Sequence, residues 1–351
     1  MTRLSPPAFW YDPDARLAPL LLSPLAWVTG QLTRRRLRRP GWRASVPVIC
    51  CGNAGVGGAG KTTLALDLLQ RLKARGLDVH ALTRGYGGSV RGVLWVDPMR
   101  HDAALVGDEA LLLAACAPTW VSADRAASAR AAIGQGAQCL VMDDGMQNPC
   151  LIQDMTLLVI DGEAGFGNGR LLPAGPLRES VSSAAARAGA AILIGEDRHG
   201  ALNLLPEGLP VLRARLLMGP EAEALRGRRL AAFAGIGRPD KFFRALEALG
   251  LDVVLRTGFA DHHRYDAAEL AGLAARADAA GAILVTTPKD AVRLPAAFRR
   301  QVVILGVGLR WDDAAGLEAV LDRASSTGMA SAVMQSSVMR PAAIERPYPT
   351  L

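Results

Sequence analysis

The feature that most constrains this chain is a glycine-rich stretch that fills every fixed position of the phosphate-loop pattern G-x-x-x-x-G-K-[ST]. A short apolar run at 46–51 precedes it, and leucines at helical spacing follow it as far as Gly76. A strand, loop and helix in this order turn backbone N–H groups toward an anion. A glycine-rich turn without a ligand is the alternative, but the complete pattern predicts a nucleoside triphosphate site. The predicted nucleotide-binding residues are Gly55, Val56, Gly57, Gly58, Ala59, Gly60, Lys61, Thr62 and Thr63.

Side chains of this loop and an acidic pair further along the chain suit the chemistry of a bound triphosphate. Lys61 is expected to reach the outer phosphates, and the Thr62 hydroxyl is expected to help hold Mg²⁺. The apolar run that starts at Cys139 ends in Asp143 and Asp144, and phosphate-loop enzymes place such an acid at a strand end to hold Mg²⁺. A polar strand terminus would look the same in isolation. Beside this loop, we predict that at least one of the two acids serves the metal.

The order of strand-like and helix-like segments predicts an α/β fold in two parts. From 46 to 215, apolar strands alternate with helical patterns, which favours a mostly parallel sheet of the P-loop NTPase type with helices on both faces. A second, smaller α/β lobe is expected at 216–324, and the polar stretch at 196–229 is interpreted as the crossover. Periodicity ends near Ser325, so 325–351 is expected to be a mobile tail. Strands are expected near 46–51, 79–83, 119–121, 139–143, 157–161, 191–195, 230–235, 251–256, 282–287 and 302–307.

The first 45 residues differ from the rest in composition. The chain has a net charge of +7, and six of its arginines fall between Arg34 and Arg43, which indicates a local anionic surface such as phospholipid or nucleic acid. A leucine-rich segment with Trp27 precedes these arginines. This composition is typical of an interfacial membrane anchor, although a helix packed on the protein's own core fits it equally well. An uninterrupted apolar stretch long enough to span a membrane is missing from the sequence, and the positive charge follows the apolar segment, which argues against a cleaved signal.

Polar residues in other loops are further candidates for the chemistry. Asp108 and Glu109 open an expected helix, where acids ordinarily complement the helix dipole but could also serve as base and metal support. His262 lies in a polar loop of the second half; it is either solvated or delivered to the first domain for proton transfer. Arg84 and Arg178 lie in Gly/Pro-rich loops and could contact phosphate, although loop arginines are common.

Taken together, these stretches closely resemble the tetraacyldisaccharide 4'-kinases, the lipid A 4'-kinases of Gram-negative bacteria. The resemblance covers roughly residues 5–310 in the family's order, through GNAGVGGAGKTT, TRGYGG, VGDEALLLA, DDGMQN, GNGRLLPAGPLRE, ADHHRY and TTPKDAVRL. One departure is that the family's usual DDGFQH reads DDGMQN here, with Met146 and Asn148 at the changed positions. The departure weakens any role that depends on a histidine there, while both acids and Gln147 remain.

The resemblance implies an activity and assigns roles to the candidate residues. It implies transfer of the ATP γ-phosphate to the 4'-hydroxyl of a tetraacylated glucosamine disaccharide 1-phosphate, which yields lipid IVA. By the same resemblance, Asp108 takes the hydroxyl proton with help from His262, Glu109 lies near the metal, and ATP and Mg²⁺ are the cofactors. Lys61 neutralises charge on the outer phosphates, as phosphoryl transfer requires. On the substrate side the expected residues are Arg84, Gln147 and Arg178.

The acylated acceptor also favours membrane contact for residues 1–45. The resemblance implies a peripheral enzyme on the cytoplasmic face of the bacterial inner membrane, bound to an anionic lipid surface and not to nucleic acid, with no obligate protein partner. Two alternatives remain at this point. A nucleotide-driven switch or assembly ATPase would need no acceptor base, and a cytosolic small-molecule kinase would leave the Trp- and Leu-rich N-terminus without a purpose.

Overall fold

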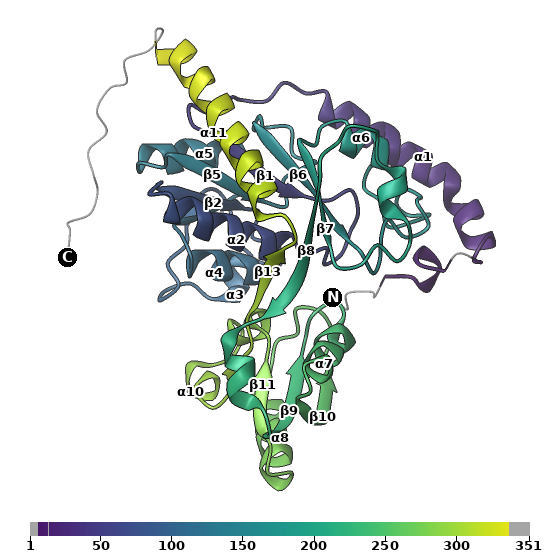
Figure 1. The fold of residues 1–351 in the computed structure, drawn as a ribbon, viewed down its shortest axis with the longest axis vertical. Helices are drawn as coiled ribbons and strands as arrows, with labels where there is room; N and C mark the ends of the chain where they lie inside the picture. The colour runs from purple at the N-terminus through teal and green to yellow at the C-terminus, as the bar shows by residue number, and fades with distance from the viewer. Residues whose placement is uncertain (1–5, 13, 337–351) are drawn as a thin grey trace.

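A nine-stranded sheet forms the centre of the large domain in the computed structural model, which describes residues 6–12 and 14–336 (Figure 1). Its strands are β1 (Val48–Gly52), β2 (Val79–Thr83), β3 (Leu94–Trp95), β4 (Thr119–Val121), β5 (Cys139–Asp143), β6 (Met155–Asp161), β7 (Ala190–Ile194), β8 (Val211–Met218) and β13 (Val307–Trp311). They lie in the order β13-β8-β7-β6-β1-β5-β2-β4-β3. All neighbours from β8 to β4 are parallel, and only the two outermost strands, β13 and β3, pair antiparallel.

Helices cover both faces of this sheet because its central strands are apolar on both sides. Strands β1, β2, β5, β6 and β7 are buried along their whole length, as parallel strands between helical layers must be. The fold class predicted from the sequence is therefore confirmed. The helices of the large domain are α2 (Lys61–Ala74), α3 (Ala103–Val106), α4 (Asp108–Ala114), α5 (Arg125–Gly134), α6 (Val181–Ala185) and α11 (Ala314–Ser336), with a 3-10 turn, η2 (Ala201–Leu204).

A smaller parallel sheet, in the order β10-β9-β11-β12, forms a second lobe. Phe242 and Phe243 of one helix pack on one face of this sheet, and Leu270 and Leu273 of another pack on the opposite face. The expected second α/β series is therefore present in this part of the chain. Its elements are η3 (Pro220–Leu225), β9 (Arg229–Ala234), α7 (Pro239–Ala248), β10 (Asp252–Gly258), α8 (Ala267–Ala279), β11 (Ile283–Thr286), α9 (Pro288–Ala291), α10 (Ala296–Arg299) and β12 (Val303–Ile304).

The chain returns from the lobe to the large domain, which corrects the lobe boundary expected at 216–324. Strand β8 lies within 196–229, the stretch expected to be a crossover, but it is an eight-residue strand of the large sheet. Strand β13 pairs antiparallel with it, Val307 opposite Met218, and the Gly219 N–H donates to the Gly306 carbonyl at 2.8 Å. These contacts join residues about ninety positions apart, and local periodicity carries no information about them. The lobe therefore comprises residues 219–306.

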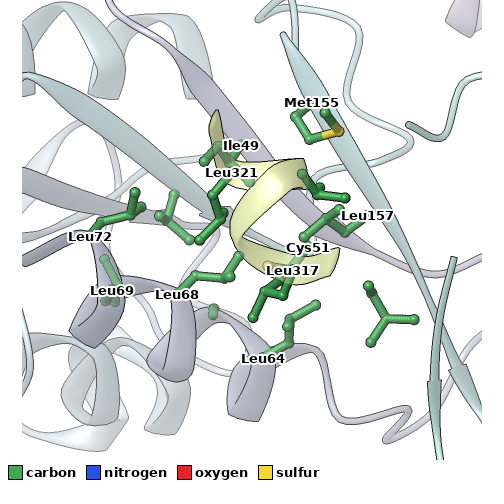
Figure 2. Packing of buried hydrophobic residues seen from close by; sticks show 14 of the residues in the cluster. Ile49, Cys51, Leu64, Leu68, Leu69, Leu72, Met155, Leu157, Leu317 and Leu321 are labelled. Carbon is green, nitrogen blue, oxygen red and sulfur yellow. The ribbon is translucent and has the colours of Figure 1, made fainter. Parts of the chain in front are cut away.

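The helix that follows, α11, completes the core of the large domain. Leu317 and Leu321 are fully buried between the sheet and the leucines of α2 (Figure 2). Arg71 Nη1 of α2 bonds Glu318 Oε1 at 2.8 Å beside this contact. The helix also continues to Ser336, so the irregular tail expected from Ser325 begins later than the sequence suggested. The remaining part of that prediction, 337–351, lies outside the described residues.

A 21-residue helix, α1 (Leu17–Leu37), lies along the outside of the large domain after a short turn, η1 (Ala8–Trp10) (Figure 1). It packs through a narrow stripe of residues, Pro19, Ala26 and Gly30. A Cβ atom at Gly30 would lie 2.6 Å from Leu171, so glycine permits the close approach. Within the described ranges, no helix combines the length and apolar character that crossing a membrane would require.

Candidate active site

The glycine-rich loop connects β1 to α2 at the carboxyl edge of the large sheet. Gly57 and Gly60 have φ angles of +113° and +88°, which glycine adopts without strain. At Gly60 space matters as well, because a Cβ atom would lie 2.7 Å from Ile194. Lys61 is the first residue of α2, and its Nζ donates to the Gly57 carbonyl at 3.4 Å. All the predicted nucleotide-binding residues thus lie in one loop and the first turn of a helix, an arrangement that suits a bound phosphate.

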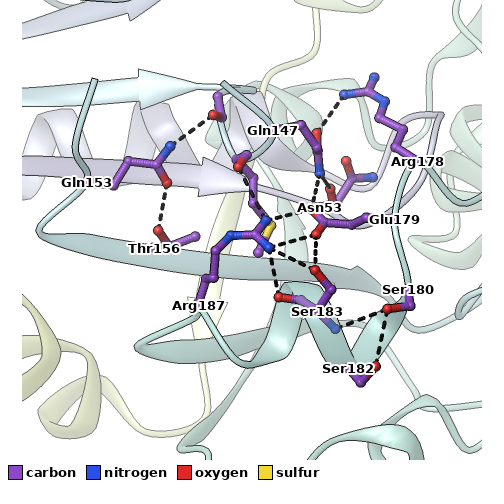
Figure 3. A network of polar contacts seen from close by, with 12 residues as sticks. Asn53, Gln147, Gln153, Thr156, Arg178, Glu179, Ser180, Ser182, Ser183 and Arg187 are labelled. Carbon is purple, nitrogen blue, oxygen red and sulfur yellow. Dashed lines mark hydrogen bonds and ion pairs between the residues drawn. The ribbon is translucent and has the colours of Figure 1, made fainter. Parts of the chain in front are cut away.

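A polar network supports this loop from the side (Figure 3). The Arg178 backbone N–H donates to the Ala54 carbonyl at 2.8 Å. Gln147 Nε2 donates to the Asn53 carbonyl at 2.7 Å and to Glu179 Oε1 at 2.9 Å. The buried Glu179 carboxylate in turn accepts from Arg187 at 2.7 Å. Gln147 Nε2 therefore donates to two groups of this network. The resemblance placed Gln147 on the substrate side, and that role stays a prediction. Glu179 is the last residue of the stretch GNGRLLPAGPLRE, whereas Arg187 lies in an alanine-rich stretch without a functional signal.

The two adjacent carboxylates after β5 occupy different electrostatic environments. Thr62 Oγ1 donates to Asp143 Oδ2 at 2.9 Å, while burial and the neighbouring Asp144 raise the pKa of Asp143 to about 6. Asp144 has a left-handed backbone, with φ at +53°, and its Oδ1 accepts from Arg178 Nη1 at 3.0 Å. Burial opposes ionisation of Asp144, but Lys61 and Arg178 outweigh it and hold its pKa below the ordinary value. The acid pair thus divides into one carboxylate beside Thr62 and one neutralised by basic side chains.

The oxygen atoms around Thr62 fit a magnesium ion. Asp143 Oδ1 and Glu109 Oε2 are buried without a hydrogen-bond partner, which is costly unless a cation or water completes them. Mg²⁺ is typically held by one or two carboxylates together with phosphate oxygens and water. Among the described residues no three His, Cys, Asp or Glu side chains converge.

Asp108 and His262, from the two lobes, meet beside this loop. Asp108 begins α4 after Gly107, where a Cβ atom would lie 2.6 Å from the Tyr86 carbonyl oxygen. His262 Nδ1 lies 2.7 Å from Asp108 Oδ2, and the two side chains are 14% and 6% exposed. The residues are 154 positions apart in sequence. The structure therefore brings together the two residues that were expected to share the acceptor proton, and their catalytic role remains a prediction.

Two basic side chains near α9 extend this contact, and the sequence reasoning missed both. Lys289 Nζ lies 2.6 Å from Glu109 Oε1, and although burial opposes its charge, Glu109 raises the pKa of Lys289. Arg293 Nε lies 3.2 Å from Asp108 Oδ2. In the stretch TTPKD, Thr287 accepts the N-cap bond of α9 from the Asp290 N–H. The available signal was a pair of basic residues four apart, Lys289 in this short helix and Arg293 just after it.

A second set of ion pairs joins the lobes at the end of β6. Asp161 pairs with Arg238 and with Lys241, whose Nζ lies 3.4 Å from Asp161 Oδ1. Lys241 also lies 3.5 Å from Glu163. The lobes are therefore joined by charged contacts on two sides of the glycine-rich loop. Among the residues that the structure describes, Arg84 is exposed and takes part in neither set.

This arrangement defines a class of protein. A phosphate loop whose threonine faces a strand-end aspartate, next to a carboxylate–histidine pair, is typical of a P-loop phosphotransferase that acts on a hydroxyl group.

Comparison with known proteins narrows the class. The family model described as Tetraacyldisaccharide-1-P 4'-kinase matches residues 18–326, and the chain belongs to this family. It is 60% identical over 316 residues to the Tetraacyldisaccharide 4'-kinase of Gluconacetobacter diazotrophicus, covering 90% of this chain and 97% of that one. It is 58% identical over 321 residues to the protein of the same name from Rhodospirillum centenum, with 90% and 95% covered.

A solved structure agrees with this assignment. The crystal structure of LpxK from Aquifex aeolicus in complex with ATP superposes with a TM-score of 0.73 at 25% identity, covering 88% of this chain and 100% of that chain. The predicted kinase class is therefore confirmed, together with the ATP and Mg²⁺ that a kinase of this family uses.

Proposed function

We propose that this chain transfers the γ-phosphate of ATP to the 4'-hydroxyl of tetraacyldisaccharide 1-phosphate, which yields lipid IVA in lipid A biosynthesis. The observation that carries the proposal is the 2.7 Å contact between Asp108 and His262 beside a complete phosphate loop. A hydroxyl acceptor must lose a proton during transfer, and a carboxylate in this position can take it. An assembly ATPase transfers its phosphoryl group to water, which P-loop hydrolases typically only orient, so such a pair is not expected there.

In this proposal the chain contributes positioning, charge and one proton acceptor. The loop amides and Lys61 bind the outer phosphates. Thr62 and Asp143 would hold Mg²⁺, with Glu109 beside them, and the bound ion helps to neutralise the triphosphate. Within the described residues, His262 contacts Asp108 through Oδ2, which leaves Oδ1 to accept the proton of the 4'-hydroxyl.

The direct test is to incubate the purified protein with Mg-ATP and the disaccharide 1-phosphate, and to analyse the lipid by mass spectrometry and ³¹P NMR. We expect one added phosphate at the 4' position. Steady ATP hydrolysis with an unchanged lipid would contradict the proposal and favour a switch or assembly ATPase. Phosphorylation of water-soluble hydroxyl compounds without the lipid would favour a cytosolic small-molecule kinase.

We propose further that α1 docks the enzyme on the anionic surface of the cytoplasmic face of the inner membrane, without a protein partner. Large apolar side chains on the side of α1 away from its packing stripe support this, with Leu17 and Leu21 each 70% exposed and Trp27 66% exposed. The exposed arginines at 34–36 follow on the same helix. Each basic residue near such a surface contributes about 1 kcal/mol, and buried leucine surface adds about 25 cal/mol per Å².

The two contributions can be separated by flotation with liposomes that contain anionic lipid. Replacement of Arg34, Arg35 and Arg36 by Gln should weaken binding and flatten its salt dependence. Replacement of Leu21, Leu25 and Trp27 by Ser should release the protein even at low salt. Leu22, in the same leucine-rich segment, is half-buried and is left unchanged.

A matched control is the replacement of exposed leucines elsewhere, Leu204→Ser and Leu217→Ser, which should leave flotation unchanged. ATP binding should persist in all these variants, because the phosphate loop lies outside α1. If the two α1 variants float like the wild type, α1 is not the anchor.

A further inference from the structure

Arg293, two residues after the end of α9, is a charged side chain to which the proposed mechanism gives no role. Its side chain is only 3% exposed. Burial of a guanidinium group is unfavourable unless its donors are satisfied, because the charge loses its hydration. The contacts that satisfy it therefore show what this residue is built to hold.

Its hydrogen bonds go to backbone carbonyls of Lys289, of the loop at Gly235 and of the loop that carries His262. Arg293 Nε donates to the Lys289 carbonyl at 2.9 Å. Arg293 Nη1 donates to the His263 carbonyl at 2.9 Å and to the Gly235 carbonyl at 3.1 Å, and Nη2 donates to the same Gly235 carbonyl at 3.1 Å. Asp290 Oδ1 lies 3.3 Å from Nη2. The Gly235 carbonyl also accepts the backbone N–H of His262 at 3.0 Å. The guanidinium group thus fixes the backbone on the carboxyl side of His262 and the carbonyl to which His262 itself is bonded.

His262 needs such support because its backbone is left-handed. Its φ angle is +59°, a region that is unfavourable for a non-glycine residue unless its surroundings hold it there. In this conformation the imidazole points out of the lobe toward Asp108 and lies 5.7 Å from the Tyr86 ring, centroid to centroid. A change in the loop would move the ring away from the carboxylate.

The same guanidinium group reaches the large domain. Arg293 Nε lies 3.2 Å from Asp108 Oδ2, the oxygen that also contacts His262 Nδ1 at 2.7 Å. One oxygen of the carboxylate therefore has two partners from the smaller lobe, which restricts rotation of the carboxyl group. A catalytic group that is held in the productive orientation reacts far faster than one that rotates freely.

We infer that Arg293 is a positioning residue for the proton-accepting pair: it holds the His262 loop in place and, with the lobes together, fixes the Asp108 carboxylate with Oδ1 toward the acceptor. The inference rests on the proposed function, because it takes Asp108 as the group that accepts the 4'-hydroxyl proton. With only 3% of its side chain exposed, Arg293 is placed to act through the pair. A planar fork suits this role, since its carbonyl and carboxylate partners lie in different directions.

The test compares Arg293→Lys and Arg293→Met in the wild-type protein and in a His262→Ala background. Arg293→Lys keeps the charge and loses the fork, so kcat should fall about 10-fold or more, while KM for ATP changes less than about 2-fold. In the His262→Ala background the same change should cost less than about 3-fold, because the pair is already broken and effects within one unit are not additive. Arg299→Lys, an exposed arginine of the same lobe, should match the wild type.

A purely structural role predicts a different pattern. Equal fold-losses in both backgrounds, or an Arg293→Lys variant with wild-type kcat, would overturn the inference. Arg293→Met leaves buried acceptors unpaired and can fail to fold; the Lys variant, checked by circular dichroism and ATP binding, then carries the test. Asp108→Asn is assayed in parallel. If it retains turnover, the proposed mechanism fails; if it is inactive while Arg293→Lys is normal, only the present inference fails.

Discussion

The nucleotide side and the acceptor side of this site are built in different ways. On the nucleotide side, Lys61, Thr62 and the Asp143–Asp144 pair contact one another entirely within the large domain. On the acceptor side, Asp108 depends on His262 and Arg293 of the smaller lobe for its contacts. In the proposed mechanism, ATP binding therefore requires one folded domain, whereas acceptance of the proton requires the two lobes to meet. Binding and turnover should accordingly respond to different substitutions.

The largest expected effect is on the acceptor side. Asp108→Asn removes the proton acceptor but preserves the shape of the side chain, so kcat should fall by about 10³-fold with little change in ATP affinity. Steady-state kinetics on the acylated acceptor and calorimetry with ATP measure the two quantities. Loss of ATP binding with normal kcat at saturation would mean that the two sides are not separate.

The next largest effect is on the nucleotide side. Lys61→Ala removes a charge that faces the transferring phosphoryl group, so kcat should fall by about 10²-fold. Lys61 also lies 3.9 Å from Asp144, so its loss leaves less positive charge to offset that carboxylate beside the triphosphate. ATP affinity should therefore fall as well, in contrast to the Asp108 variant. Near-normal turnover at saturating ATP would exclude this loop as the active site.

The smallest expected effect is on stability, and it comes from Asp143 on the nucleotide side alone. Burial raises the pKa of Asp143 from 3.8 to about 6 in the folded protein, so the folded state favours the protonated acid. Stability from this group is present below pH 4 and is lost as the pH rises through 6. Without metal and nucleotide, Asp143→Asn should therefore raise Tm relative to the wild type at pH 7.5 and not at pH 4. The corresponding gain in the free energy of unfolding at pH 7.5 is about 3 kcal/mol at most.

Thermal unfolding in EDTA at the two pH values measures this difference. The exposed Asp14→Asn serves as the control and should leave Tm unchanged. An Asp143→Asn shift of the same size at both pH values would show that charge burial is not its cause.

The same division explains what could be predicted from the sequence. The glycine-rich loop and its helix are continuous in the chain, so their pattern was sufficient to predict the fold around them. Asp108 and His262 are 154 residues apart, and only the family resemblance linked them, because position alone left both with ordinary explanations. Arg293 was missed for the same reason: its partners Gly235, His263 and Asp108 lie in separate segments of the chain.

The pairing of β13 and the burial of α11 also could not be predicted from local sequence patterns. The strand expected at 302–307 covers β12 and only the first residue of β13, and the pairing of β13 with β8 assigns it to the large sheet. The apolar positions of α11 follow the lobe in sequence, yet they fill the core against α2. Long-range contacts decide both cases, and a periodic pattern specifies an element without specifying its neighbour.

The pairing of β8 with β13 has a consequence for how this enzyme is assembled. Because Gly219 and Gly306 are hydrogen-bonded to each other, the whole smaller lobe is topologically the loop of a β-hairpin. The two neighbouring strands connect the lobe to the large domain at one edge. Such a double connection favours a hinge motion of the lobe over a rotation about the connection. A two-residue Asn-Gly turn could join Met218 to Val307 directly, since this is the loop length that hairpins prefer. The shortened chain should remain folded and bind ATP, and it should have no proton acceptor pair with which to use it.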